Sequence, residues 1–339
     1  MAKISIKDVA KEAGVSLTTV SQILNKKSDR FSEKTVNKVV EAKKRLGYFP
    51  NKNAQQLRGN NIKSVGVLLP NLTNPFFSTM MQTMDSYKSD NVDLFFLTAK
   101  ENEIEKGIIH LVERGVDGLV IAQMINNPSI LNNYLNEHNI PYIVLDQSDD
   151  YGFTDIVRTD EKRGGKLAAE HLIEYGHTKL LIAQPYMLTS NMQARVDGFK
   201  QHCENYNLAS PLVIETDLSK EGGFSIVDQI IESQVSAIFA MNDEMTIGII
   251  RGLVNKGLNI PDDISIIGFD DIDIAKYLNP SLTTVAQPIE KISKASLSLI
   301  TNKLQDSNED GIHNINLANE LIIRETTKKL NKYIKRSKK

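Results

Sequence analysis

Short apolar runs alternate with longer amphipathic stretches along most of the chain, from about residue 61 to residue 327. Each apolar run has the length of a buried strand, and the stretches between them repeat apolar positions at helical spacing. This alternation predicts parallel sheets with crossover helices, and the length suits two such lobes. The expected strands are 64–70, 92–98, 117–122, 141–146, 179–185, 212–217, 236–243 and 263–271. The expected helices include 76–89, 103–114, 161–175, 191–206, 222–233 and 244–256.

The N-terminal segment follows a different pattern, which predicts three short helices. Helix N-caps are expected at Ser5, Ser16 and Ser32, and glycine stops at Gly14 and Gly47. Two helices joined by a tight turn that contains glycine, with a third packed behind them, form a helix-turn-helix unit. The side chains expected to point inward are Ile6, Val9, Ala10, Ala13, Val20, Ile23, Leu24, Val36, Val39, Val40 and Leu46.

The second of these helices has an outer face without charge, although the segment around it is rich in lysine. A helix that lies in the major groove of DNA needs short side chains that hydrogen-bond or touch base edges, while basic residues around it meet the phosphates. A small helical bundle with an uncharged surface is the alternative interpretation. The outer face consists of Leu17, Thr18, Ser21, Gln22 and Asn25, and the plausible phosphate contacts are Lys3, Lys7, Lys26, Lys27 and Lys34.

Charge is distributed unevenly, although the formal net charge is only −2. Residues 1–60 hold 13 Lys and Arg against 5 Asp and Glu, whereas residues 61–327 hold 20 against 37. A basic segment on an acidic remainder indicates that the segment meets a polyanion and the remainder does not. The tail, residues 328–339, carries 7 basic residues and is most simply a solubilising end.

Composition excludes several classes of protein. No run of about 18 apolar residues is present, and the charged N-terminus does not resemble a signal peptide, so a cytoplasmic location is expected. The single cysteine, Cys203, excludes an intramolecular disulfide and a cysteine metal cage, and it is expected to be a neutral thiol. The histidines show no metal spacing, and the segment EKRGGK lacks the order of a phosphate-binding loop. We therefore expect neither a bound metal nor a cofactor, and we expect that the protein is not an enzyme.

Two motifs resemble the lactose-repressor family of bacterial transcription regulators. The segment IKDVAKEAGVSLTTVSQILN is similar to the family's N-terminal signature, and GYFPNKNAQQLRG is similar to its hinge. The resemblance covers about residues 4–327 and implies an α/β protein. Its expected parts are a helix-turn-helix domain at 1–49, a hinge helix at 50–60, a periplasmic-binding-protein-like, two-lobed effector-binding and dimerisation domain at 61–327, and the basic tail.

The resemblance also implies which residues bind DNA. Leu57 matches the leucine that wedges into the minor groove at the centre of the operator, where it kinks the duplex. Many family members have arginine where this chain has Gln22, so the operator preference is expected to differ. The alternative for residues 50–60 is a flexible linker. The implied DNA-binding residues are Ser16, Leu17, Thr18, Thr19, Ser21, Gln22, Asn25, Asn51, Asn53, Ala54, Leu57 and Arg58.

In the family, an effector binds in the cleft between the two lobes, beyond the carboxyl ends of the strands. Arg195 and Asp270 are the strongest candidates, because a guanidinium and a carboxylate suit the oxygens and hydroxyls of a sugar. They form a structural ion pair in the alternative interpretation. Asp243 is interpreted as a cap of its helix, and Phe77 as a packing residue. The implied effector-binding residues are Asn74, Phe76, Asp146, Arg195, Phe224, Asn242, Asp270 and Gln287.

The hypothesis is a homodimeric repressor of a sugar-utilisation operon that an effector releases from a pseudo-palindromic operator on double-stranded DNA. The segments VLDQSDDYGFTDIVRTD and LIAQPYMLTSNMQARVDGF resemble ribose-operon repressors, so ribose is the first choice of effector and sucrose or another sugar the next. A purine is less favoured, since no aromatic sandwich is evident. The alternatives from other classes are a sugar-binding protein without DNA function and an enzyme on an α/β scaffold.

Overall fold

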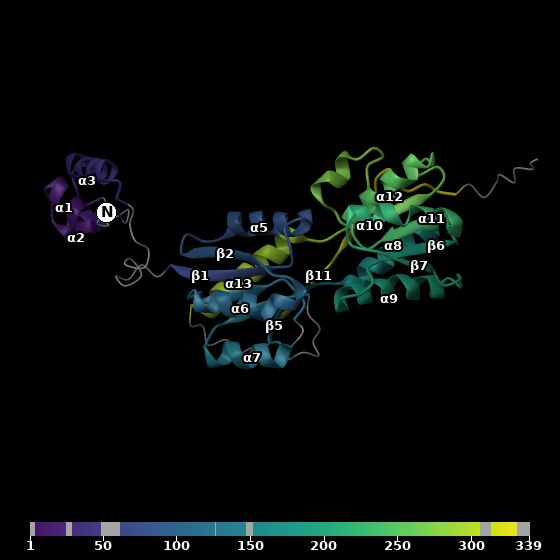
Figure 1. Ribbon diagram of the computed structural model, residues 1–339, viewed down its shortest axis with the longest axis horizontal. Coiled ribbons are helices and arrows are strands. Elements are labelled where there is room, and N and C mark those ends of the chain that lie inside the picture. The colour runs from purple at the N-terminus through teal and green to yellow at the C-terminus, as the bar shows by residue number, and fades with distance from the viewer. Residues whose placement is uncertain are drawn as a thin grey trace, which may run out of the picture. The chain divides into compact units, whose positions relative to one another are not determined.

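The computed structural model describes residues 4–24, 29–48, 62–125, 127–146, 152–305 and 313–330. The chain divides into two compact units, Met1–Ile62 and Lys63–Lys339. We call the first unit the head and the second the body (Figure 1).

The described part of the head consists of three helices, as the sequence pattern predicts. Ser5 caps the first helix, and its backbone N–H donates a 2.7 Å hydrogen bond to Asp8. Ser16 and Ser32 each accept a hydrogen bond from the backbone N–H three residues later. These caps confirm the predicted helix starts. The helices are α1 (Ile6–Ala13), α2 (Leu17–Leu24) and α3 (Glu33–Leu46).

One face of each of the three helices packs into the core of the head. Gly14 and Gly47 end α1 and α3 with left-handed φ angles of 65° and 60°, which confirms the predicted stops. The prediction that Val40 points inward is wrong, because its side chain is 49% exposed. Ala42, one helical turn from Val39, is buried instead, and its small side chain lets α3 approach the other helices. The fully buried residues are Val9, Val20 and Val39.

The body contains two six-stranded sheets, which we call sheet A and sheet B. Each of the eight expected strands is confirmed within a few residues. Sheet A consists of β1 (Lys63–Leu69), β2 (Val92–Thr98), β3 (Gly118–Ile121), β4 (Tyr142–Leu145), β5 (Asp155–Thr159) and β11 (His313–Leu317). Sheet B consists of β6 (Leu180–Gln184), β7 (Leu212–Glu215), β8 (Ala237–Ala240), β9 (Ser265–Asp270), β10 (Thr283–Ala286) and β12 (Glu320–Ile322).

Strand order follows the doubly wound pattern in both sheets. The order is β11-β5-β4-β3-β1-β2 in sheet A and β12-β10-β9-β8-β6-β7 in sheet B. The pairs in sheet A are parallel, and those in sheet B are parallel except at the edge strand β12, which runs antiparallel to β10. The fold class is therefore α/β, as predicted, with one antiparallel strand that the sequence pattern did not indicate.

Helices pack against each sheet and define two lobes (Figure 1). Lobe 1 contains sheet A, and lobe 2 contains sheet B. In the described part of the body, 3-10 helices lie at η1 (Glu101–Glu103) and η3 (Asp273–Tyr277). The helices of lobe 1 are α5 (Pro75–Tyr87), α6 (Ile104–Glu113), α7 (Pro128–Glu137) and α13 (Ile289–Leu304). Those of lobe 2 are α8 (Glu161–Glu174), α9 (Ser190–Asn205), α10 (Lys220–Ser225), α11 (Val227–Ser233) and α12 (Asp243–Asn255).

The chain passes between the lobes at three crossings. It leaves sheet A after β5 and enters α8, returns after β10 into α13, and leaves again between β11 and β12. Because β4 and β5 end beside the first crossing and β9 and β10 end beside the second, the carboxyl ends of four strands point to the same region. No helix in the described part of the chain is both long and apolar enough to cross a membrane.

Candidate functional site

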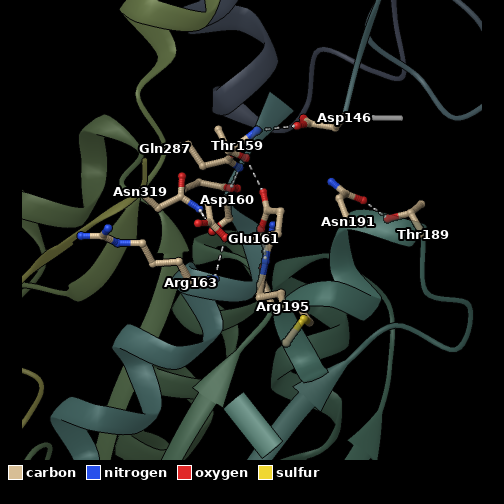
Figure 2. A network of polar contacts seen from close by, with 12 residues as sticks. Asp146, Thr159, Asp160, Glu161, Arg163, Thr189, Asn191, Arg195, Gln287 and Asn319 are labelled. Atoms are coloured by element: carbon tan, nitrogen blue, oxygen red, sulfur yellow. Dashed lines mark hydrogen bonds and ion pairs between the residues drawn. The ribbon is translucent and has the colours of Figure 1, made fainter. Parts of the chain in front are cut away.

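Arg195, on α9, is the centre of a polar network at the first crossing (Figure 2). Its side chain is 3% exposed, and Nε donates a 2.9 Å hydrogen bond to Oε2 of Glu161. One terminal nitrogen donates to the Met241 carbonyl, and the guanidinium carbon lies 3.3 Å from the ring centroid of Phe269. The guanidinium is thus fixed by an ion pair, a carbonyl and an aromatic face. Two of its five N–H groups are used in these bonds, so three remain for other acceptors.

Two glycines bring α8 and α9 close enough for this ion pair. A Cβ on Gly165 of α8 would collide with the Arg195 carbonyl, and a Cβ on Gly198 of α9 would collide with the Lys162 carbonyl. The backbones of the two helices therefore touch where Glu161 and Arg195 face each other. This contact accounts for the second glycine of EKRGGK, whereas a Cβ on the first, Gly164, would collide with Asn319 and Phe269.

Glu161 is the site residue that the sequence interpretation missed. Its side chain is 4% exposed, and it holds Arg195 with one oxygen while the other accepts a 2.7 Å hydrogen bond from the Thr159 hydroxyl. Arg195 was expected to pair with Asp270 if it formed a structural ion pair, and the structure corrects that partner to Glu161. The available signal was the position of Glu161, two residues after the last residue of β5, at a strand end like the other candidates.

Asp146 and Asp270 lie at the ends of β4 and β9 with positive φ angles of 53° and 112°. Such angles are uncommon for residues other than glycine, and they cluster at functional sites. Asp146 accepts a 3.2 Å hydrogen bond from the Thr159 backbone, and Asp270 accepts one of 2.7 Å from Nε2 of Gln287. Gln287 lies at the second crossing, so both carboxyl groups are held by the segments that join the lobes.

Burial and nearby negative charge disfavour ionisation of both aspartates. Removal from water, followed by the charge of Glu161, raises the pKa of Asp146 to about 7. Removal from water also raises the pKa of Asp270 to about 6, because the opposing effects of Arg195 and of hydrogen bonds from Gln287 and Asn74 only partly offset it. The site therefore holds more carboxyl groups than its single guanidinium neutralises.

The asparagines among the candidates are helix caps. Asn74 accepts a 3.0 Å hydrogen bond from the Phe76 backbone at the start of α5, and Asn242 accepts one of 2.9 Å from the Met245 backbone at the start of α12. Each cap uses the amide oxygen, so the amide N–H groups of both side chains point away from the helix backbone. The Asn74 side chain interacts with Asp270 as a hydrogen-bond donor, and this interaction lowers the pKa of that aspartate.

Asp243 does not cap its helix, so that expectation is wrong. It is fully buried and accepts hydrogen bonds from the Ile272 backbone at 3.0 Å and from the Thr284 hydroxyl at 2.7 Å. Burial and the nearby charge of Asp270 raise its pKa well above the usual range. Asp243 therefore ties the start of α12 to β10 and to the residues after β9.

The two phenylalanine candidates lie in different surroundings. Phe76 is 5% exposed and packs in the core of lobe 1, edge-on to Phe77 with ring centroids 5.1 Å apart. Phe77 packs against the same core, as expected, and the contact of the Phe76 ring with a ligand stays a prediction. Phe224 is 47% exposed on α10 and is not joined to the polar network by any contact among the described residues.

The candidate DNA-binding residues are described only in part. Thr18 is exposed on the outer face of α2, and Ser21 and Gln22 are partly buried. Ser16 and Thr19 form the cap of α2 through a 3.0 Å hydrogen bond, and Leu17 also packs against the core of the head. The following candidates lie outside the described residues: Asn25, Asn51, Asn53, Ala54, Leu57 and Arg58.

A helical head with a helix whose outer face is uncharged, followed by two parallel-sheet lobes with a polar network at their crossings, is the arrangement expected of a DNA-binding regulator with a periplasmic-binding-protein-like body. Comparison with known families matches residues 5–51 to the bacterial regulatory proteins of the LacI family. It also matches residues 169–327 to a periplasmic binding protein-like domain.

Individual relatives extend over nearly the whole chain. The HTH-type transcriptional repressor PurR of Photobacterium profundum is 32% identical over 336 residues, which cover 96% of this chain and 99% of that protein. The structure of the lac repressor dimer bound to operator and the anti-inducer ONPF covers 96% of this chain and 100% of its own, with a TM-score of 0.80 and 27% identity. The chain therefore belongs to the LacI family and is a DNA-binding repressor, not an enzyme.

Two solved structures of higher identity match a smaller share of the chain. A LacI family transcriptional regulator from Enterococcus faecium, solved with bound ribose, is 37% identical, with a TM-score of 0.75. The match covers 79% of this chain and 100% of that one. A second such regulator, from Enterococcus faecalis V583 and also with bound ribose, is 37% identical with a TM-score of 0.73.

Proposed function

We propose that this repressor controls a sugar-utilisation operon and that ribose binds among Arg195, Asp146 and Asp270. Binding of ribose releases the protein from a pseudo-palindromic operator that two chains recognise together. Because its operator lies on bacterial DNA, the protein acts in the cytoplasm.

The observation that carries the proposal is the convergence of these three side chains with Gln287 at the crossings. Arg195 has N–H groups left for sugar oxygens, while ionised Asp146 and Asp270 accept from sugar hydroxyls. Oε1 of Gln287 is buried and has no hydrogen-bond partner among the residues that the structure describes. A buried acceptor without a partner is costly, and a hydroxyl donor from a ligand removes that cost.

The polar side chains of the site support a sugar more than a purine, although PurR repressors match almost the whole chain. The two regulators solved with ribose are 37% identical over matches that cover 79% of this chain, and PurR of Photobacterium profundum is 32% identical over a match that covers 96%. An aromatic face is a favourable stacking partner for a flat purine ring. The guanidinium of Arg195 covers one face of Phe269, and the exposed Phe224 is not joined to the described network. Sucrose remains the alternative among sugars.

For the head, we propose that α2 reads base edges in the major groove through Thr18, Ser21 and Gln22. The proposal includes a hinge at residues 50–60 that orders on DNA and inserts Leu57 into the minor groove. Ribose changes the spacing of the two hinges in the dimer. A hundredfold change in operator affinity requires about 2.7 kcal/mol of coupling, which lies within the usual range of allosteric proteins.

The proposal is tested by titrating ribose, sucrose and hypoxanthine into the full-length protein by calorimetry, and by repeating gel shifts on an operator fragment with each compound. We expect ribose alone to bind and to release the DNA. The Arg195→Lys variant loses the planar fork and should bind ribose at least about tenfold more weakly. Arg163→Lys, an exposed change on the neighbouring helix α8, is the matched control and should bind as the wild type does. Binding of hypoxanthine without ribose would overturn the proposal.

A further inference from the structure

Glu161 joins the two lobes through side-chain contacts rather than through the chain alone. One carboxylate oxygen accepts from the hydroxyl of Thr159, the last residue of β5 in sheet A, over 2.7 Å. The other accepts from Nε of Arg195, on α9 of lobe 2, over 2.9 Å. Both side chains of the ion pair are almost fully buried, with 3% and 4% exposure. Of these two hydrogen bonds, the one to Thr159 connects the lobes, so its length depends on the angle between them, whereas the one to Arg195 lies within lobe 2.

The Glu161 side chain also fixes the orientation of the guanidinium. Nε donates to Glu161, one terminal nitrogen donates to the Met241 carbonyl, and one face of the guanidinium plane lies on the Phe269 ring. The three N–H groups that remain, one on Nη1 and two on Nη2, are available to other acceptors. A guanidinium whose side chain is fixed before binding loses less conformational entropy when the ligand arrives.

The negative charge of Glu161 disfavours ionisation of the other carboxyl groups of the site. The groups that face it are Arg195 from α9, Asp146 from the end of β4 and Asp270 from the end of β9. Asp243, at the start of α12, acts on Asp270 in turn. Burial is the larger cause of the raised pKa of Asp146 and of Asp270, and the charge of Glu161 raises both further. It therefore shifts upward the pH at which the two aspartates ionise.

We propose that Glu161 is a positioning residue for the effector: it fixes Arg195 across the lobe crossing and, through its charge, sets the pH range in which the site binds a polyhydroxyl ligand. This inference rests on the proposed sugar function. Ribose hydroxyls donate best to ionised carboxylates, so ribose affinity should rise with pH as Asp146 and Asp270 lose their protons.

The test is ribose affinity of full-length Glu161→Gln, measured by calorimetry at pH 6 and at pH 8 and compared with the wild type. At pH 8 both aspartates are ionised in either protein, so the variant shows only the loss of the fixed guanidinium, about tenfold weaker binding. At pH 6 the variant binds only about twofold more weakly, because its aspartates ionise more readily without the neighbouring charge. A purely structural effect of the substitution would weaken binding equally at both values.

Two further variants separate the effect of the position of the Glu161 carboxylate from the effect of its charge. Glu161→Asp keeps the charge but shortens the side chain, so it should weaken binding by the same factor at pH 6 and pH 8. Glu244→Gln is the matched control, because Glu244 is also buried and ion-paired, with Lys220, in the first turn of α12. It should leave the pH dependence of ribose binding unchanged.

A measurement without ligand distinguishes failure of this inference from failure of the proposed function. The midpoint at which the stability of the ligand-free protein changes with pH should lie at lower pH in Glu161→Gln than in the wild type. If ribose does not bind but this midpoint shifts, the sugar proposal fails and the electrostatic role of Glu161 stands. If the midpoint stays in place, or if ribose affinity and its pH dependence match the wild type, the inference is overturned.

Discussion

At the scale of single residues, the aspartates at the strand ends make the ligand-free protein less stable as pH rises. The pKa values of Asp146 and Asp270 in the folded chain are about 7 and about 6, raised from 3.8. The folded state therefore binds more protons than the unfolded state between pH 3.8 and about 7. The stability that these two groups contribute is fully present below pH 3.8 and is lost as pH rises through the folded values.

We expect this loss to amount to about 4 kcal/mol of unfolding free energy between pH 5 and pH 8, measured by urea denaturation. Other groups also titrate, so the relevant quantity is the difference from Asp146→Asn/Asp270→Asn, which keeps both shapes without the carboxyl groups. The unfolding free energy of the double variant should therefore rise relative to that of the wild type as pH rises. Parallel profiles of the two proteins would show that the carboxyl groups are not destabilised by folding.

Sequence reasoning located Arg195, Asp146 and Asp270 because each ends a strand or belongs to a recognised motif. It missed Glu161, which was interpreted only as part of a helix, and it assigned Arg195 the wrong alternative partner. A pair between residues 34 positions apart depends on how two helices pack, and the spacing of each residue along its own helix does not contain that information. The roles of Phe76 and Asp243 depend on the same kind of distant contact.

At the scale of secondary-structure elements, the close approach of α8 and α9 is what creates the ion pair of the site. We expect Gly165→Ala to push the helices apart, because its Cβ would collide with the Arg195 carbonyl. The cost should be about 1–3 kcal/mol of unfolding free energy, with weaker ribose binding as well. Thermal unfolding and calorimetry measure the two effects.

Gly257→Ala provides the comparison for this substitution. A Cβ on Gly257 meets no atom within 4 Å, but its φ of 83° makes the change strained. Gly257→Ala should therefore reduce stability while leaving the ribose affinity of the folded protein intact. If Gly165→Ala lowered stability alone in the same way, the helix contact would have no part in arranging the site.

The strands that could be predicted are those whose sequences contain a continuous apolar run. The eight expected strands are apolar runs, and all eight are present. The unexpected strands β5, β10, β11 and β12 have three to five residues and include polar side chains, as in DIVRT and HNINL. Short segments of this kind form strands because a neighbouring strand pairs with them, and β11 finds its partner β5 more than 150 residues away in the chain. Periodicity within the segment does not specify such pairing.

At the scale of the whole molecule, we expect the basic head to bind DNA and the acidic body to bind the effector. Contacts with phosphates supply affinity for any DNA, whereas contacts with base edges distinguish the operator. In the proposed complex, we expect Lys34, which is exposed on α3, to make the first kind of contact and Gln22, on α2, to make the second. Because the two kinds respond differently to salt and to sequence, binding measurements on two DNA fragments can separate them.

We expect Gln22→Ala to lower the affinity for the operator about tenfold and to leave affinity for a scrambled fragment unchanged, since a base contact contributes about 1–3 kcal/mol of discrimination. Lys34→Ala should instead weaken binding to both fragments alike and reduce the dependence on salt by about one counterion per chain. Fluorescence anisotropy at about 50 to 200 mM salt measures both quantities. Equal losses on the two fragments for Gln22→Ala would mean that α2 contacts the backbone and that another element reads the bases.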